Sequence, residues 1–171
     1  MRIIVVVDLA KQVSERVVNE GLQPDYKKIR QKLPSGIESI YCGGHNGSSA
    51  NVAHLIALDY SLKIRIDKHL EDIEKLGKKM NKADKKQPLQ QKIHQQETVS
   101  HCMFHLQEYI SSMKIQKQNN ILIVSNEFGC QLLLTYALGI SIDAVHAFNI
   151  NAGSVILLDI HDMTAMNKIH F

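Results

Sequence analysis

The segment ILIVSNEFGCQLLLTYALG, residues 121–139, constrains the fold of this chain more than any other stretch. Its first four residues are β-branched or leucine, which is the pattern of a strand covered on both faces. Ser125 or Asn126 can then cap a helix, and Glu127 suits the positive end of its dipole. The apolar residues that recur on one face of this helix are Cys130, Leu133, Leu134, Ala137 and Leu138. A buried strand that leads through a tight turn into a helix predicts an open α/β sheet, in which ligands bind beyond the carboxyl ends of the strands.

Apolar patterns in the rest of the chain predict further strands and helices around this unit. We expect strands at residues 3–7, 37–42, 62–67 and 153–160. We expect helices at residues 24–33, 49–60 and 91–113, and one more carrying Leu70, Ile73, Leu76 and Met80. Residues 81–90 read as a loop, and a short polar tail should follow residue 160. This order predicts one α/β domain over residues 1–171, with a mainly parallel central sheet between two helical layers.

Size and composition support a single domain in the cytoplasm. At 171 residues, 44% of them hydrophobic, the chain can bury one core but is short for two. The apolar run at residues 3–7 is far too short for a signal peptide or a membrane span, so we expect no membrane association. Cys42, Cys102 and Cys130 are widely spaced, which favours reduced structural thiols over disulfides or a zinc site.

The charge is small but unevenly distributed. A formal net charge of +3 makes nucleic acid an unlikely partner. Residues 61–92 nevertheless carry ten Lys or Arg against five Asp or Glu. We interpret the basic segment 75–92 as a solvated helix end and loop, and a polyanion-binding patch is the alternative.

Several polar residues fall where the carboxyl ends of the predicted strands meet. Asp8 follows the first strand, and the glycine-rich turn GGHNGSS, residues 43–49, leads into a helix as anion-binding turns do. His45 lies in that turn, and Ser48 and Ser49 read most simply as helix caps. With Asn126 and Glu127, these residues predict a pocket at one edge of the sheet.

Three histidines repeat along the predicted helix at residues 91–113. His94, His101 and His105 are seven and four residues apart and therefore share one side of that helix. Such a face can bind a transition metal, but it lacks a ligand from another element. We therefore predict solvated histidines, no metal and no cofactor.

Several segments, in order, also match motifs of a known family. MRIIVVVDLA resembles a strand that ends in RHG, and VVNEGLQPDYKKIRQKL resembles an LTEEG helix. IYCGGHNGSSANVAHLIA is similar to the SSPLxRAxQTA motif, and IRIDKHLEDI is similar to the strand leading to a catalytic acid. ETVSHCMFHLQEYI resembles a helix with ES and a later Arg, and ILIVSNEFG resembles VSHG. Together these resemble the histidine phosphatase superfamily, which implies a phosphoglycerate mutase-like fold of the compact phosphohistidine phosphatase type.

The family chemistry implies roles that this chain fills with other residues. In the family, a first His accepts the phosphoryl group, two Arg clamp it, a second His supports transfer and a carboxylic acid protonates the leaving group. Val7 and Asp8 stand here at the first Arg and His, Ser48 at the second Arg, and Asn126 at the second His.

The remaining family positions hold a glutamate, a histidine and two candidate acids. Glu127 replaces the Gly of VSHG, and His105 stands near the helix Arg. Glu71 or Asp72 matches the acid.

This substitution pattern predicts a catalytically degenerate member, a pseudophosphatase that binds or regulates an unknown small molecule or protein. The alternative is an active phosphomonoesterase or phosphohistidine phosphatase with a remodelled site, in which Asp8 is the nucleophile. Asp8 capping a neighbouring amide is the simpler interpretation of that residue, because the cationic partners are missing.

Overall fold

The structure is a computed structural model that describes residues 1–8, 24–82, 89–115, 119–160 and 168–170. Its strands are β1 (Arg2–Val7), β2 (Ser39–Cys42), β3 (Ile64–Ile66), β4 (Ile121–Ser125), β5 (Val155–Asp159) and β6 (Lys168–His170). Its helices are α2 (Pro24–Lys32), α3 (Ser48–Tyr60), α4 (Lys68–Lys82), α5 (Leu89–Ile115), α6 (Glu127–Leu138) and the short 3-10 helix η1 (Ile142–Ala147).

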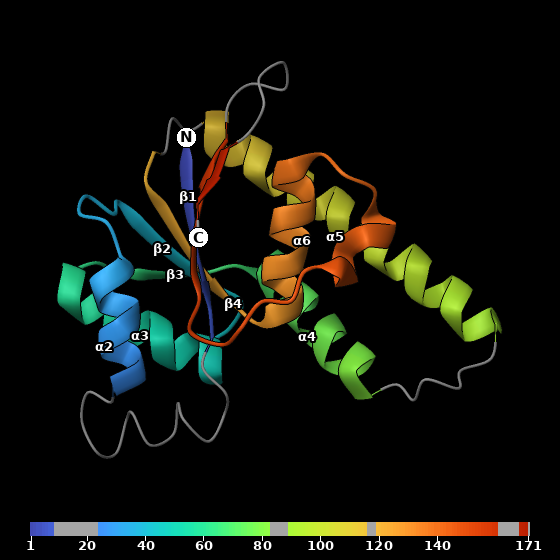
Figure 1. The fold of residues 1–171 in the computed structure, drawn as a ribbon, viewed down its shortest axis with the longest axis horizontal. Coiled ribbons are helices and arrows are strands. Elements are labelled where there is room, and N and C mark those ends of the chain that lie inside the picture. The colour runs from blue at the N-terminus through green and yellow to red at the C-terminus, as the bar shows by residue number, and fades with distance from the viewer. Residues whose placement is uncertain (9–23, 83–88, 116–118, 161–167, 171) are drawn as a thin grey trace.

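The strands form one sheet in the order β3-β2-β4-β1-β5-β6, which runs through the middle of the molecule in Figure 1. The first four are mutually parallel, whereas β5 and β6 add to one side in antiparallel pairs. β1 lies beside β4 with Val7 opposite Ser125. The predicted α/β fold with a mainly parallel sheet is confirmed, and its two most apolar strands, β1 and β4, pair at its centre.

Each face of the sheet is covered by its own helices. In Figure 1, α2 and α3 lie on one side and α4, α5 and α6 on the other. Strand alternation supplies both cores: Val5 and Ile123 pack on the α5 and α6 side, and Val6 and Leu122 pack on the α3 side. All five residues of β4 are buried, which explains their continuous apolar pattern.

The long helix packs as its spacing predicted. Val99, Leu106, Ile110 and Met113 are buried on α5, and Met103 is partly buried against the same core. Leu58 and Leu138 were expected on buried helix faces but are 77% and 42% exposed. Both residues lie in the last turn of their helices, Leu58 in α3 and Leu138 in α6.

Other differences concern element boundaries. α4 continues to Lys82 and α5 begins at Leu89, so the expected loop at residues 81–90 is helical at both ends, and its remainder lies outside the described residues. The expected polar tail contains β6, which pairs with β5. η1 was not anticipated, because its six residues carry no helical apolar period.

Candidate functional site

The end of β1 brings Asp8 into contact with two serines at the start of α3. The backbone N–H of Asp8 donates to the Ser125 carbonyl at 2.8 Å, which extends the β1–β4 ladder by one residue. The Ser48 hydroxyl donates to Oδ2 of Asp8 in a short hydrogen bond, and the Ser49 hydroxyl donates to the same oxygen at 3.0 Å. Both serine hydroxyls are therefore directed at Asp8.

Glu74 of α4 is a second carboxylate in this cluster. It is 7% exposed, and its Oε1 accepts a hydrogen bond of 3.3 Å from the buried Ser125 hydroxyl. The sequence-based choice of acid, Glu71 or Asp72, missed Glu74. A helical stripe at i, i+3, i+4 and i+7 from Leu70 would have added Glu74 as a third candidate, because Glu74 shares that stripe with Ile73 and Gly77, both of which are buried.

Burial raises the pKa of both carboxyl groups. For Asp8, loss of hydration raises the pKa, while hydrogen bonds from Ser48 and Ser49 and the charge of Lys78 act in the opposite direction. For Glu74, loss of hydration again comes first and the charge of Asp8 adds to it, against hydrogen bonds from Ser49 and Ser125 and the charge of Lys78. The charge of Asp8 thus disfavours ionisation of Glu74.

Asn126 caps α6, as the sequence predicted. Its Oδ1 accepts from the Gly129 N–H at 2.9 Å, and its Nδ2 donates to the Glu74 carbonyl at 3.0 Å. Gly129 lies directly over Ser125, since a Cβ added there would be 2.2 Å from the Ser125 Oγ. We call Asp8, Ser48, Ser49, Glu74, Ser125 and Asn126 the Asp8 cluster.

The glycine-rich turn has structural reasons for its glycines. A Cβ on Gly43 would lie 2.7 Å from the backbone nitrogen of Glu71, so α4 can approach only a glycine. Gly47, the N-cap residue of α3, has a φ of 119°, in the region that favours glycine. These two glycines therefore do not by themselves indicate a phosphate site.

Three further predicted site residues contact neighbours outside the Asp8 cluster. Glu71 forms an ion pair of 2.9 Å with Lys75, and this partner lowers the pKa of Glu71. Glu127 is exposed and accepts from the Gln131 side chain at 3.3 Å. His45 is exposed and lines a groove beside β3.

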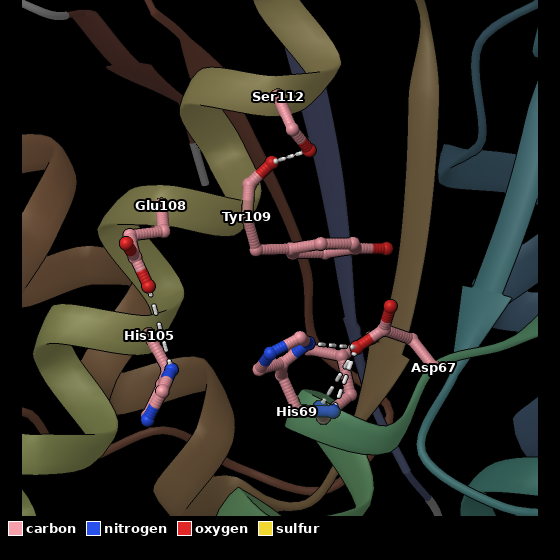
Figure 2. A network of polar contacts seen from close by, with 7 residues as sticks. Asp67, His69, His105, Glu108, Tyr109 and Ser112 are labelled. Atoms are coloured by element: carbon pink, nitrogen blue, oxygen red, sulfur yellow. Dashed lines mark hydrogen bonds and ion pairs between the residues drawn. The ribbon is translucent and has the colours of Figure 1, made fainter.

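His105 and Asp72 belong to a different region, which we call the α4–α5 cavity. This cavity of about 270 Å³ is lined by Lys68, His69, Asp72, Ile73, His101, Cys102 and His105. His105 Nε2 lies 3.0 Å from His101 Nε2, and its Nδ1 lies 3.5 Å from Glu108. Figure 2 shows the His69 ring beneath the ring of Tyr109. Asp67 Oδ1 lies 3.3 Å from His69 Nδ1, and it accepts hydrogen bonds from the backbone amides of His69 and Leu70 at the start of α4. The structure thus groups His105 with α4 and α5 histidines.

The arginine side chains in the described part of the chain have partners outside the Asp8 cluster. Arg2 pairs with Asp159, Arg30 pairs with Asp59, and Arg65 donates to the Tyr41 hydroxyl. Arg16 and the side chain of His94 lie outside the described residues. Within the residues described, no group of three or more His, Cys, Asp or Glu side chains is arranged to hold a metal ion. None of the helices described is both long and apolar enough to cross a membrane.

Sequence comparison identifies the family. The family model described as histidine phosphatase superfamily (branch 1) matches residues 51–168. The chain belongs to the histidine phosphatase superfamily. The match runs from within α3 to the start of β6, and it includes the segments that hold Glu74 and Asn126. The comparison with curated proteins gave no match.

Solved structures of this superfamily share the fold over nearly the whole chain. The α-ribazole phosphatase from Shigella flexneri has 18% sequence identity and a TM-score of 0.61, covering 95% of this chain and 92% of that chain. The phosphoserine phosphatase from Entamoeba histolytica, in complex with 3-phosphoglyceric acid, has 10% identity and a TM-score of 0.65, covering 98% and 94%. At these identities the likeness shows the fold alone.

Proposed function

We propose that this protein is a catalytically degenerate histidine phosphatase, a pseudophosphatase with a binding or regulatory role. One observation carries the proposal: the side chains that the resemblance places at phosphate-handling positions are engaged in hydrogen bonds within the protein. Ser48 donates to Asp8, and Asn126 uses its amide on the backbone of α4 and α6. These donors are therefore not directed at a ligand.

Electrostatics at the cluster also oppose a phosphate. Asp8 and Glu74 are two partly or fully buried carboxyl groups, and Lys78 is the one cation among the described residues that affects the pKa of both. A phosphate dianion placed beside them would meet like charge in a poorly hydrated site, at a cost on the order of several kcal/mol. The resemblance assigns two arginines to this task, and the corresponding residues here are Val7 and Ser48.

The proposed role is to bind a small molecule or a protein through a fold that no longer transfers phosphate. A cytoplasmic location is part of this proposal, supported by three buried cysteines that are unpaired.

A second candidate is an active phosphomonoesterase that uses Asp8. Both serine bonds go to Oδ2, so Oδ1 of Asp8 would attack phosphorus while the ester oxygen leaves with a proton. Glu74 would donate that proton, because its pKa is raised, and water would then hydrolyse the aspartyl phosphate. The position of Glu74 beside Asp8 favours this candidate.

An activity assay separates the two candidates. The purified protein is incubated with p-nitrophenyl phosphate and with phosphohistidine, with and without Mg²⁺, beside Asp8→Ala and Asp8→His variants. We expect turnover at background for all three proteins. Losing one preorganised electrostatic contact commonly costs about a hundredfold or more in rate, and several are missing here. Robust turnover that disappears in Asp8→Ala would establish the phosphomonoesterase instead.

A further inference from the structure

An apolar groove lies beside the edge strand β3. Its volume is about 570 Å³, and it is lined by His45, His54, Ala57, Leu58, Ser61, Leu62, Lys63, Ile64 and Ile66. Leu58 is 77% exposed, the highest value among the large apolar side chains described, and Ile66 is 37% exposed. Ile64 and Leu62 pack against the core beneath α3, so the groove is the open end of that core. Contiguous exposed apolar surface of this kind marks an interaction site.

The same groove is bordered by unpaired backbone. β3 is the terminal strand of the sheet and pairs only with β2 among the described strands. Strand alternation directs Ile64 and Ile66 to the groove, whereas Arg65 lies on the opposite face against Tyr41. An extended segment added along β3 would therefore gain main-chain hydrogen bonds and an apolar contact together.

The charges around the groove indicate what kind of segment fits. Its lining includes Lys63, His45 and His54 and no acidic side chain. Two acids adjoin the groove residues in sequence: Asp59 is bound to Tyr26 and Arg30, and Asp67 is bound to the amides of His69 and Leu70 on α4. The groove therefore presents basic groups to an occupant.

A second copy of this chain fits the edge less well. Antiparallel pairing of two β3 strands about a two-fold axis through their middle residue would place Arg65 opposite Arg65, and like charges directly opposite are unfavourable. An acidic partner meets the same edge with opposite charge.

We propose that β3 and its groove bind an extended acidic segment of another protein, which adds as a strand to the sheet edge and seats apolar side chains against Leu58 and Ile66. The proposal concerns a surface separate from the Asp8 cluster and holds whether or not that cluster is catalytic.

The test measures binding of a fluorescein-labelled peptide of alternating Glu and Val, seven residues long, by fluorescence anisotropy. We expect saturable binding with half-saturation below about 100 µM, and binding at least about tenfold weaker for the matching Lys–Val peptide. Binding should weaken with added salt, and amide hydrogen exchange at β3 should slow when the Glu–Val peptide is present.

Two pairs of variants localise the site. Leu58→Glu should weaken peptide binding by about tenfold or more, whereas Leu138→Glu, at an exposed leucine on α6, should not change it. Lys63→Glu should act like Leu58→Glu, and Lys27→Glu on α2 is its control. Absent binding, equal binding of both peptides, or a dimer that Leu58→Glu dissociates would each overturn the proposal.

Discussion

The Asp8 cluster and the α4–α5 cavity lie on different faces of α4, and their polar side chains differ in how their hydrogen bonds are satisfied. In the Asp8 cluster, Ser49 and Ser125 donate to the two carboxylates. In the region around the cavity, the buried Tyr109 hydroxyl has no hydrogen-bond partner among the residues described. A satisfied buried network stabilises one arrangement of the chain, whereas an unsatisfied group costs free energy. The Asp8 cluster thus forms a structural junction of β1, α3, α4 and β4.

The largest expected effect is at the close contact within this junction. Gly129→Ala would place a Cβ 2.2 Å from the Ser125 Oγ, which the short serine side chain cannot avoid without moving. We expect a loss of about 2–3 kcal/mol in the free energy of unfolding, from overpacking. Gly44→Ala is the control, because its added Cβ would meet no atom closer than 3.9 Å. Urea denaturation measures both, and equal stability of the two variants would contradict the described packing.

A smaller loss is expected from removing a donor. The Ser49→Ala variant loses the hydroxyl that donates a hydrogen bond to Asp8 and also interacts favourably with the Glu74 carboxylate. Hydrogen bonds to charged groups contribute about 1.5–3 kcal/mol, so we expect a loss near the lower end of that range at pH 7. The exposed Ser111→Ala on α5 should change stability by less than about 0.5 kcal/mol. A neutral Ser49→Ala would mean that the cluster does not stabilise the fold.

The raised pKa of Glu74 gives a pH-dependent prediction. Because the folded pKa lies above its ordinary value of 4.5, the folded state holds the proton more tightly, and wild-type stability should fall as pH rises from that value through the folded pKa. Glu74→Gln keeps the hydrogen-bonding oxygen but removes this titration. Its melting temperature relative to wild type should therefore be higher at pH 8 than at pH 4, by a few degrees.

The control for this comparison is Asp72→Asn, whose side chain is 57% exposed and should show no such trend. At this chain length about 1 kcal/mol corresponds to roughly 2–4 °C, which thermal unfolding resolves. A Glu74→Gln variant whose melting temperature relative to wild type falls as pH rises would contradict the pKa direction.

The smallest effect is expected in the region around the α4–α5 cavity. Tyr109→Phe removes a buried hydroxyl that has no hydrogen-bond partner while keeping the ring that stacks on His69. We expect stability within about 0.5 kcal/mol of wild type or slightly above it, since replacing an unpaired polar group by an apolar one is nearly neutral. A loss comparable to that of Ser49→Ala would show that the two regions do not differ as described.

Patterns among a few neighbouring residues in the sequence determined the fold and part of the site. The apolar run of β4 and the cap at Asn126 each depend on a few neighbouring residues, so both could be predicted from residues 121–139. Asp8 could be placed beside the end of β4, because two strands apolar throughout belong at the centre of a parallel sheet.

The tertiary structure decided which side chains join Asp8. Glu71, Asp72 and Glu74 lie within one turn of α4, and the sequence does not determine how that helix is rotated about its axis. Close packing at Gly77, where a Cβ would lie 2.6 Å from the Cβ of Phe128, turns one face of α4 toward α6. That rotation buries Glu74 beside Asp8 and leaves Asp72 facing His105 across the α4–α5 cavity. Helix rotation depends on contacts between residues about fifty positions apart, which local periodicity cannot specify.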